Sequence, residues 1–418
     1  MSGSIPLIVE QHAEEAAILW LQRVRAVEAP HYNRMFLSRL DERLEAQIDG
    51  LLVAGDLGWD VARAAFDRYP QPGEMFVLSA LAFGAGADAA IGEVLDLLEG
   101  DTDGTLLPAA IGGIGWLPAA RLKGRVQPLL NGGRPVARAL GLGACSVHRV
   151  DPGPQLARFI ADPDPAVAHA SVRLAGELGR ADLLPTMADI GPDAGTAAQG
   201  MVAVTRLVLG ARGAALEAAR RLAADPGATG RAVLPALVGA DEPGAIRDWA
   251  SALGPDETAA DLRAAGMLGQ TDRVPWIIAC MAEPAHARAA GEAFSMLTGA
   301  DLAFLSLDAA AGEEPAVPND DPADPRVDLD WEADLPVPDA AAVATWWDRA
   351  ASEFTGQTAY FLGRPSDADG WRFGLDRGYQ NQRRVAAYRL ATQHPQARLE
   401  PWAAREVTRV VWKARAAP

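Results

Sequence analysis

The chain has 418 residues, enough for two or three domains at roughly 150 residues each, and its 38 basic and 55 acidic side chains give a formal charge of −17. Hydrophobic residues make up 49% of the sequence, which excludes a wholly disordered protein. The acidic balance argues against a nucleic-acid coat protein, and no uninterrupted apolar run is long enough to predict a membrane span.

The two cysteines, Cys145 and Cys280, lie far apart in the sequence, and neither has a neighbour at CxxC spacing. We therefore expect neither a disulfide scaffold nor a structural zinc site. The first twenty residues lack a basic region, and acidic residues interrupt their apolar stretch, so no signal peptide is predicted. These observations predict a cytoplasmic protein without a cofactor.

Residues 1–72 are predicted to be helical. Ile8, Leu19 and Trp20 fall near one face of a first helix, and leucines recur every three or four residues in LSRLDERLEAQIDGLL, which follows it. We interpret this region as a helical cap over the open end of a repeat array, because terminal repeats need a polar outer face.

An internal repeat occupies residues 73–307. Equivalent positions follow one another at steps of about 28–32 residues: Glu74, Thr105, Val136, Val167, Ala198, Gly230, Thr258 and His286. Each unit has the pattern of an apolar helix, a turn with glycine and a second helix; in the clearest one, Asp164 is placed to cap a helix that begins at Pro165. Stacked helix pairs of this length predict an all-α fold, an α-solenoid.

The charge changes sharply after the repeats. Residues 308–339 hold eleven acids against Arg326 alone and are rich in proline, so we predict an extended or disordered linker with Trp331 as a docking anchor. Residues 340–418 carry twelve basic and seven acidic residues. Six of the eleven tryptophans lie at position 331 or beyond, which predicts a small, mostly helical C-terminal module with large rings to bury.

Two resemblances follow from these motifs. The unit DPDPAVAHASVRLAGELG resembles the short HEAT-like repeats of the phycobilin lyase group, which implies a HEAT-like α-solenoid, an α/α superhelix, over about 73–305. The opening VEQHAEEAAILWLQRVRAVEAPHY and the later WWDRAASEF, FLGRP and QRRVAAYRLA are similar to an uncharacterised bacterial family often encoded beside type VI secretion components. That resemblance implies a role in effector loading or secretion-system assembly.

The candidate partner-binding residues all lie in the C-terminal module: Trp346, Trp347, Arg364, Trp371, Arg372, Arg383 and Arg384. Tryptophan and arginine are enriched at the centres of protein interfaces. The same residue types also grip phosphates and stack on bases, and they could instead pair with the chain's own acidic linker. Binding to a protein partner is the preferred interpretation.

Other candidate chemistry has a plainer explanation. The six histidines form no HxxxH or HExxH motif, and the glycine-rich stretches at 111–115 and 141–146 fall at helix ends within repeats. The acidic run of the linker lacks the glycine and terminal glutamate of a calcium loop. Cys145 beside His148 and Arg149 stays open as a nucleophile or bilin attachment point, although burial is the usual state of a free cysteine.

The sequence thus predicts a non-enzymatic scaffold for protein–protein interaction. The family resemblance makes an accessory or effector adaptor of bacterial type VI secretion the most concrete version, with a secretion-system component or effector as partner. One alternative is a phycobilin-lyase-like enzyme or tetrapyrrole-binding protein. Another is binding of an anionic ligand or nucleic acid through the basic C-terminal module.

Overall fold

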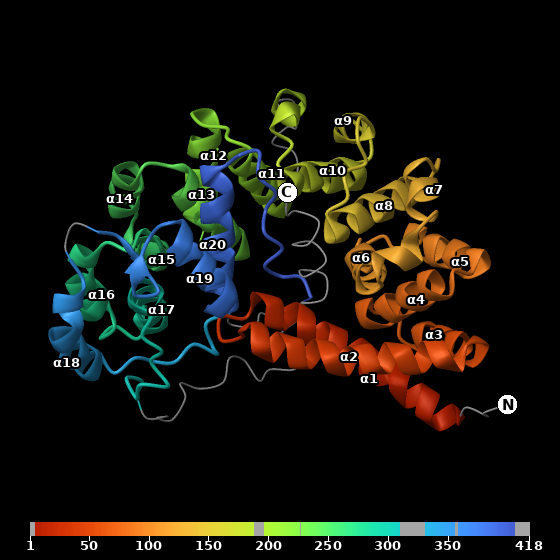
Figure 1. The fold of residues 1–418 in the computed structure, drawn as a ribbon, viewed down its shortest axis with the longest axis horizontal. Coiled ribbons are helices and arrows are strands. Elements are labelled where there is room, and N and C mark those ends of the chain that lie inside the picture. Colours follow the sequence, from red (N-terminus) through yellow and green to blue (C-terminus); the bar gives the residue numbers. More distant parts are fainter. Residues whose placement is uncertain (1–4, 188–195, 226, 310–330, 356–357, 406–418) are drawn as a thin grey trace. The chain divides into compact units, whose positions relative to one another are not determined.

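The computed structural model describes residues 5–187, 196–225, 227–309, 331–355 and 358–405, and these are almost entirely helical (Figure 1). The one pair of strands within these ranges is a short hairpin, in which β1 (Tyr360–Phe361) runs antiparallel to β2 (Arg364–Pro365). The predicted all-α fold class is confirmed. The chain divides into two compact units: Met1–Glu28, Arg34–Asp193 and Gln396–Pro418 form the first, and Ala29–Asn33 and Ala194–Pro395 form the second.

In the first unit, three helices precede the repeats, and they pack on one another and on the first repeat helix. They are α1 (Pro6–Glu28), α2 (Arg34–Ala54) and α3 (Asp56–Arg68). Four repeats follow in this unit. Their first helices are α4 (Pro72–Ala85), α6 (Leu106–Trp116), α8 (Pro135–His148) and α10 (Pro165–Leu178). The segments between them are α5 (Asp88–Glu99), η1 (Ala119–Leu122), α7 (Val126–Leu130), α9 (Gln155–Ile160) and, after α10, η2 (Ala181–Met187).

In the second unit the first helices are α11 (Thr196–Val208), α13 (Ala228–Ala240), α15 (Thr258–Leu268) and α17 (Ala287–Thr298). The segments between them are α12 (Ala214–Ala223), α14 (Pro243–Ser251), η3 (Pro255–Glu257), η4 (Thr271–Arg273) and α16 (Val274–Cys280). The C-terminal helices are α18 (Ala340–Ala350), η5 (Ala351–Glu353), α19 (Ala368–Arg377) and α20 (Gln380–Gln393).

Consecutive first helices pack against each other within each unit, from α4 through α10 and again from α11 through α17. The eight positions predicted as equivalent all fall inside these helices or at their N-terminal ends. This packing, in which each helix pair is buried by its neighbours along the chain, is the one that a helical repeat requires. The predicted repeat period is therefore confirmed by the helices themselves.

The start and the end of α10 show how the sequence sets these helices. Asp164 precedes Pro165 and accepts hydrogen bonds from the backbone N–H groups of Ala166 at 3.0 Å and Val167 at 3.2 Å, as the sequence predicted. Gly179 ends the helix in the left-handed region at φ 69°, where a residue without Cβ is unstrained.

Side chains 31 residues apart connect neighbouring repeats. Ser79 of α4 donates to the carbonyl of Ala110 of α6 at 2.8 Å, and Ser146 of α8 donates to the buried carboxylate of Glu177 of α10. Glu177 also accepts hydrogen bonds from Arg149 at 2.8 Å and Arg173 at 3.0 Å. Burial alone would raise the pKa of Glu177, but these two guanidiniums outweigh it and lower the pKa below its usual value.

Backbone N–H groups of the hairpin region bind the C-terminal ends of repeat helices in the second unit. Tyr360 donates to the carbonyl of Gly269 at 2.8 Å, immediately after α15, and Leu362 donates to Met296 of α17 at 2.8 Å. Gly269 has φ 69°, and a Cβ on it would lie 1.8 Å from the Tyr360 oxygen. Only glycine satisfies both the turn and the close approach of the hairpin.

Residues 310–330 of the predicted acidic linker lie outside the described residues. Its two ends pair with each other through the backbone. The N–H of Asp339 donates to the carbonyl of Leu307 at 2.8 Å, and the N–H of Ala309 donates to that of Val337 at 2.8 Å. Asp339 also caps α18 through its side chain. The predicted domain boundaries at 72/73, 307/308 and 339/340 stay a prediction.

The substitution Gly269→Ala is expected to destabilise the second unit by about 2–4 kcal/mol, because it combines a strained φ with a backbone clash. Gly244→Ala is the matched control: Gly244 is helical in the same unit, and a Cβ there would meet nothing within 4 Å. The control should change the free energy of unfolding by no more than about 1 kcal/mol, and then toward stability. Urea unfolding followed by circular dichroism measures both; equal effects would contradict the predicted close approach.

The substitution Glu177→Gln is expected to lower the free energy of unfolding at pH 7 by about 2–4 kcal/mol, because it leaves Arg149 buried without its carboxylate. A carboxyl whose folded pKa lies below its unfolded value stabilises above that unfolded value, about 4.5, and the contribution disappears as pH falls through the folded pKa. The difference from wild type should therefore shrink between pH 5 and pH 3 in urea titrations. Glu14→Gln, at an exposed carboxylate of α1, is the control; a pH-independent difference would refute the ion pairs.

Candidate functional site

The structure does not gather the seven predicted partner-binding residues into one surface. Trp346 and Trp347 lie on α18 and are half-buried against Phe294 of α17. The centre of the Phe294 ring lies 5.6 Å from that of Trp346 and 6.3 Å from that of Trp347, and both pairs are edge-on. Trp347 also contacts Phe354. Both rings thus pack against the apolar core to which α16, α17 and α18 contribute.

Arg364, Trp371 and Arg372 lie near the hairpin and on α19. Arg364 is exposed and stacks over the ring of Phe373 at 4.0 Å, while Arg372 is exposed and pairs with Asp369 in the same helix at 2.9 Å. Trp371 is buried and donates from Nε1 to Ser366 at 3.1 Å. Only the two arginines of this group face solvent.

Arg383 and Arg384 lie on α20, and the structure corrects the view of them as a surface anchor. Arg383 is only 1% exposed and donates from Nε to the carbonyl of Leu375 at 3.0 Å. Arg384 is 7% exposed and donates to the Asn381 side chain at 3.1 Å. Because α20 packs against α13, the guanidiniums of Arg383 and Arg384 are buried inside the fold.

A cluster of guanidinium groups in the second unit was missed by sequence reasoning. We define the arginine cluster as Arg231 of α13, Arg263 of α15 and Arg384 of α20, which interact electrostatically. Burial and the other two guanidiniums lower the pKa of Arg231. Arginines 32 residues apart on successive first helices were the available signal, because equivalent repeat positions share a face.

An aromatic ring and a carboxylate from the end of the acidic segment contact this cluster. The Trp331 ring lies 4.9 Å from the guanidinium carbon of Arg231 and 5.4 Å from that of Arg263. Glu332, the next residue, forms an ion pair with Arg263. The sequence predicted that Trp331 anchors the segment. In the structure, cation–π contacts with Arg231 and Arg263 hold its ring.

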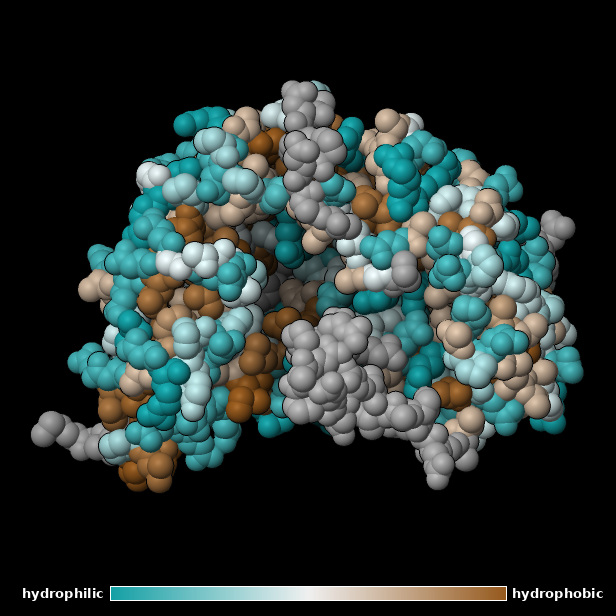
Figure 2. All heavy atoms as spheres, turned by 180° about the vertical axis from the view of Figure 1, so that it is seen from behind, coloured by the Kyte–Doolittle hydropathy of each residue, from teal (hydrophilic) through white to brown (hydrophobic). Residues whose placement is uncertain are grey.

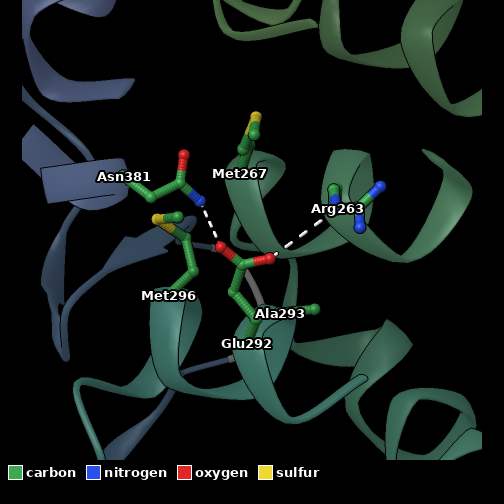
Figure 3. Close-up of a pocket in the computed structure, with 6 residues that line it drawn as sticks. All are labelled: Arg263, Met267, Glu292, Ala293, Met296 and Asn381. Carbon is green, nitrogen blue, oxygen red and sulfur yellow. Dashed lines mark hydrogen bonds and ion pairs between the residues drawn. The ribbon is translucent and has the colours of Figure 1, made fainter. Parts of the chain in front are cut away.

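A second carboxylate, that of Glu292, lies beside Arg263 of the arginine cluster (Figure 3). Glu292 of α17 is nearly fully buried, accepts a hydrogen bond from Asn381 and lies 3.7 Å from Nε of Arg263. Burial raises the pKa of Glu292, and Arg263 opposes this effect. The carboxylate compensates part of the positive charge that the fold concentrates here.

The void beside Glu292 is not a ligand cavity. The residues that line it, which Figure 3 draws as sticks, leave no space between them for a water molecule. The residues are Arg263, Met267, Glu292, Ala293, Met296 and Asn381. The aromatic and acidic contacts of the arginine cluster come instead from Trp331 and Glu332.

Cys145 does not have the environment of a nucleophile. Its side chain is buried in α8, and burial, with a smaller contribution from Asp151, raises the pKa of the thiol to about 11. Catalytic cysteines need the opposite shift. Within the described ranges no group of three or more His, Cys, Asp or Glu side chains is arranged to hold a metal ion.

Comparisons with protein-family models, curated proteins and solved structures return no match for the chain. Both resemblances drawn from the sequence motifs therefore stay predictions. None of the helices in the described ranges combines the length and the apolar character needed to cross a membrane.

Cys145 is expected to react with a thiol reagent at pH 8 about 100-fold more slowly in the folded protein than in urea, because little thiolate forms at a pKa of about 11. The measurement uses the Cys280→Ser variant, in which Cys145 is the single thiol, and Cys145→Ser as its counterpart. A folded rate close to the unfolded rate would contradict the buried environment and restore Cys145 as a candidate nucleophile.

Proposed function

We propose that the protein is a non-catalytic scaffold that binds a protein partner, and that the outer face of α1 is part of the binding surface. The observation that carries this proposal is a concentration of exposed apolar side chains. Six of the fourteen large hydrophobic residues that are exposed in the described part of the chain lie between Ile5 and Val24. Single exposed apolar residues are ordinary, but a group of them marks an interaction site.

The spacing of these residues places three of them on one side of α1. Leu7, Ile18 and Leu21 are separated by eleven and three residues, which is close to three turns and one turn of an α-helix. They are 73%, 56% and 39% exposed, while Ala16, Leu19 and Trp20 on the other side are buried. Thus α1 has one apolar side packed inside the first unit, and on its outward side these three apolar residues lie among exposed polar residues: Gln11, Glu14, Gln22 and Arg25.

The face of the molecule drawn in Figure 2 is mainly hydrophilic and has several scattered hydrophobic groups, one of which lies at the lower left near the start of α1. Binding here would follow from shape and apolar complementarity, with no covalent step. A helical partner segment with leucine-like side chains at a spacing of three or four fits such a helix face.

The concrete version that we propose is an accessory or effector adaptor of bacterial type VI secretion. It is supported by the motif resemblance at both ends of the sequence and by the repeat architecture, which serves protein binding in many solenoids. The partner is then a secretion-system component or an effector.

The test is affinity capture of the tagged full chain in its native host, with quantitative mass spectrometry. Wild type should enrich secretion spike or effector proteins, and Ile18→Glu/Leu21→Glu should reduce the enrichment about tenfold or more, because it places two charges in the apolar face. Val150→Glu is the matched control, since Val150 is an exposed apolar residue of the same unit outside α1. No enrichment, together with unchanged secretion in a deletion strain, would reject the proposal.

A further inference from the structure

We propose that the arginine cluster is a binding site for an acidic peptide that contains tryptophan, and that Trp331 and Glu332 of the chain itself occupy it as an internal ligand. This inference rests on the proposed scaffold function and names the chemistry of a partner segment. The partner would displace the chain's own Trp–Glu pair and present the same two groups to the same arginines.

The recognition has two parts, and each uses a different property of the ligand. The Trp331 ring is held by the guanidiniums of Arg231 and Arg263, at 4.9 and 5.4 Å, which requires a large aromatic face. The Glu332 carboxylate pairs with Arg263, which requires an anion one residue further on. A hydrophobic residue without a π face, or a tryptophan followed by a neutral residue, would satisfy only half of the site.

Electrostatics make an acidic ligand necessary. Arg263 is 7% exposed, and without Glu332 its remaining carboxylate neighbour is Glu292, at 3.7 Å from Nε. A buried guanidinium that loses its ion-pair partner is strongly destabilised, so the site has to be refilled by another anion when the internal ligand leaves. The internal ligand also belongs to the most acidic stretch of the sequence, 308–339. Several arginines in one place attract such a negatively charged segment.

The position of the internal ligand allows exchange. Trp331 and Glu332 are both partly exposed. The chain is anchored separately just beyond them, because Leu335 is buried and its carbonyl accepts a hydrogen bond from Arg288 at 3.2 Å. Displacement of residues 331 and 332 therefore leaves the following anchor in place, and the tethered pair competes at an effective concentration on the order of millimolar.

This tethering sets the expected affinities. A free peptide must compete with the internal ligand in wild type, so its apparent affinity is its intrinsic affinity multiplied by the fraction of sites that the internal ligand leaves free. In a variant whose internal ligand is removed, the same peptide should bind more tightly. A structural role alone predicts no binding of a free peptide in either protein.

The experiment measures the anisotropy of a fluorescein-labelled peptide with the sequence DPRVDLDWEADLP, which is that of residues 324–336. It is titrated with the full chain and with Trp331→Ala/Glu332→Gln. We expect at least tenfold tighter binding to the double variant, and loss of that binding when Arg231→Gln is added. A peptide with alanine and glutamine in place of its Trp–Glu pair should bind at least tenfold more weakly.

Matched variants keep the test decisive. Asp334→Asn removes a neighbouring carboxylate that pairs with His31 at 3.6 Å and does not contact the cluster, so it should bind peptide as wild type does. Glu332→Gln alone should bind the peptide more tightly than wild type and serves if the double variant does not fold by circular dichroism. Equal affinity for wild type and Glu332→Gln, or equal binding of a single-stranded oligonucleotide and the peptide, would overturn the proposal. This experiment uses purified proteins and variants outside α1. Its failure is therefore distinguishable from a failure of the capture experiment.

Discussion

The structure depends on how the carbonyl groups at the C-terminal ends of its repeat helices find donors. The last carbonyls of any helix lack partners within it. In the second unit, Arg389 of α20 donates to the carbonyls of Val238 in α13 and Met267 in α15, at 3.1 and 2.8 Å. Burial lowers the pKa of Arg389 to about 10, but two carbonyl acceptors at the negative ends of helix dipoles compensate part of the cost of its charge. One arginine thereby joins two consecutive repeats.

The same solution recurs in the first unit with other residues near the chain's end. Arg405 donates to the carbonyl of Trp116, the last residue of α6, at 2.6 Å, and also stacks on the Trp116 ring. The N–H of Leu399 donates to the carbonyl of Glu177 near the end of α10, at 3.0 Å. Some of the arginines after residue 340 thus donate hydrogen bonds to carbonyls at helix ends inside the protein. The number of arginines in this region is therefore weak evidence for binding of an external polyanion.

This internal use of arginine explains where binding is proposed and where it is not. Arg383 and Arg389 on α20 are buried and donate hydrogen bonds to backbone carbonyls within the second unit. The arginine cluster is different, because Arg231 and Arg263 contact Trp331 and Arg263 pairs with Glu332, two residues of the acidic segment. A site whose occupant comes from a charged segment of the same chain is suited to exchange that occupant for a similar one.

The sequence by itself determined the helices, their period and their ends. Asp164 and Gly179 act through hydrogen bonds and backbone conformation within a few residues, so local chemistry was enough to place α10 and, by repetition, the other first helices. Only the tertiary structure decided which charges are buried. The three arginines of α20 lie on different sides of the helix, among alanine and valine, so they form no single polar side. Nothing local therefore separates Arg383 inside the fold from Arg372 on the surface. The contact of Trp331 with Arg231 and Arg263 likewise joins residues about 70–100 positions apart, and burial and charge pairing over such distances depend on which helices the fold brings together.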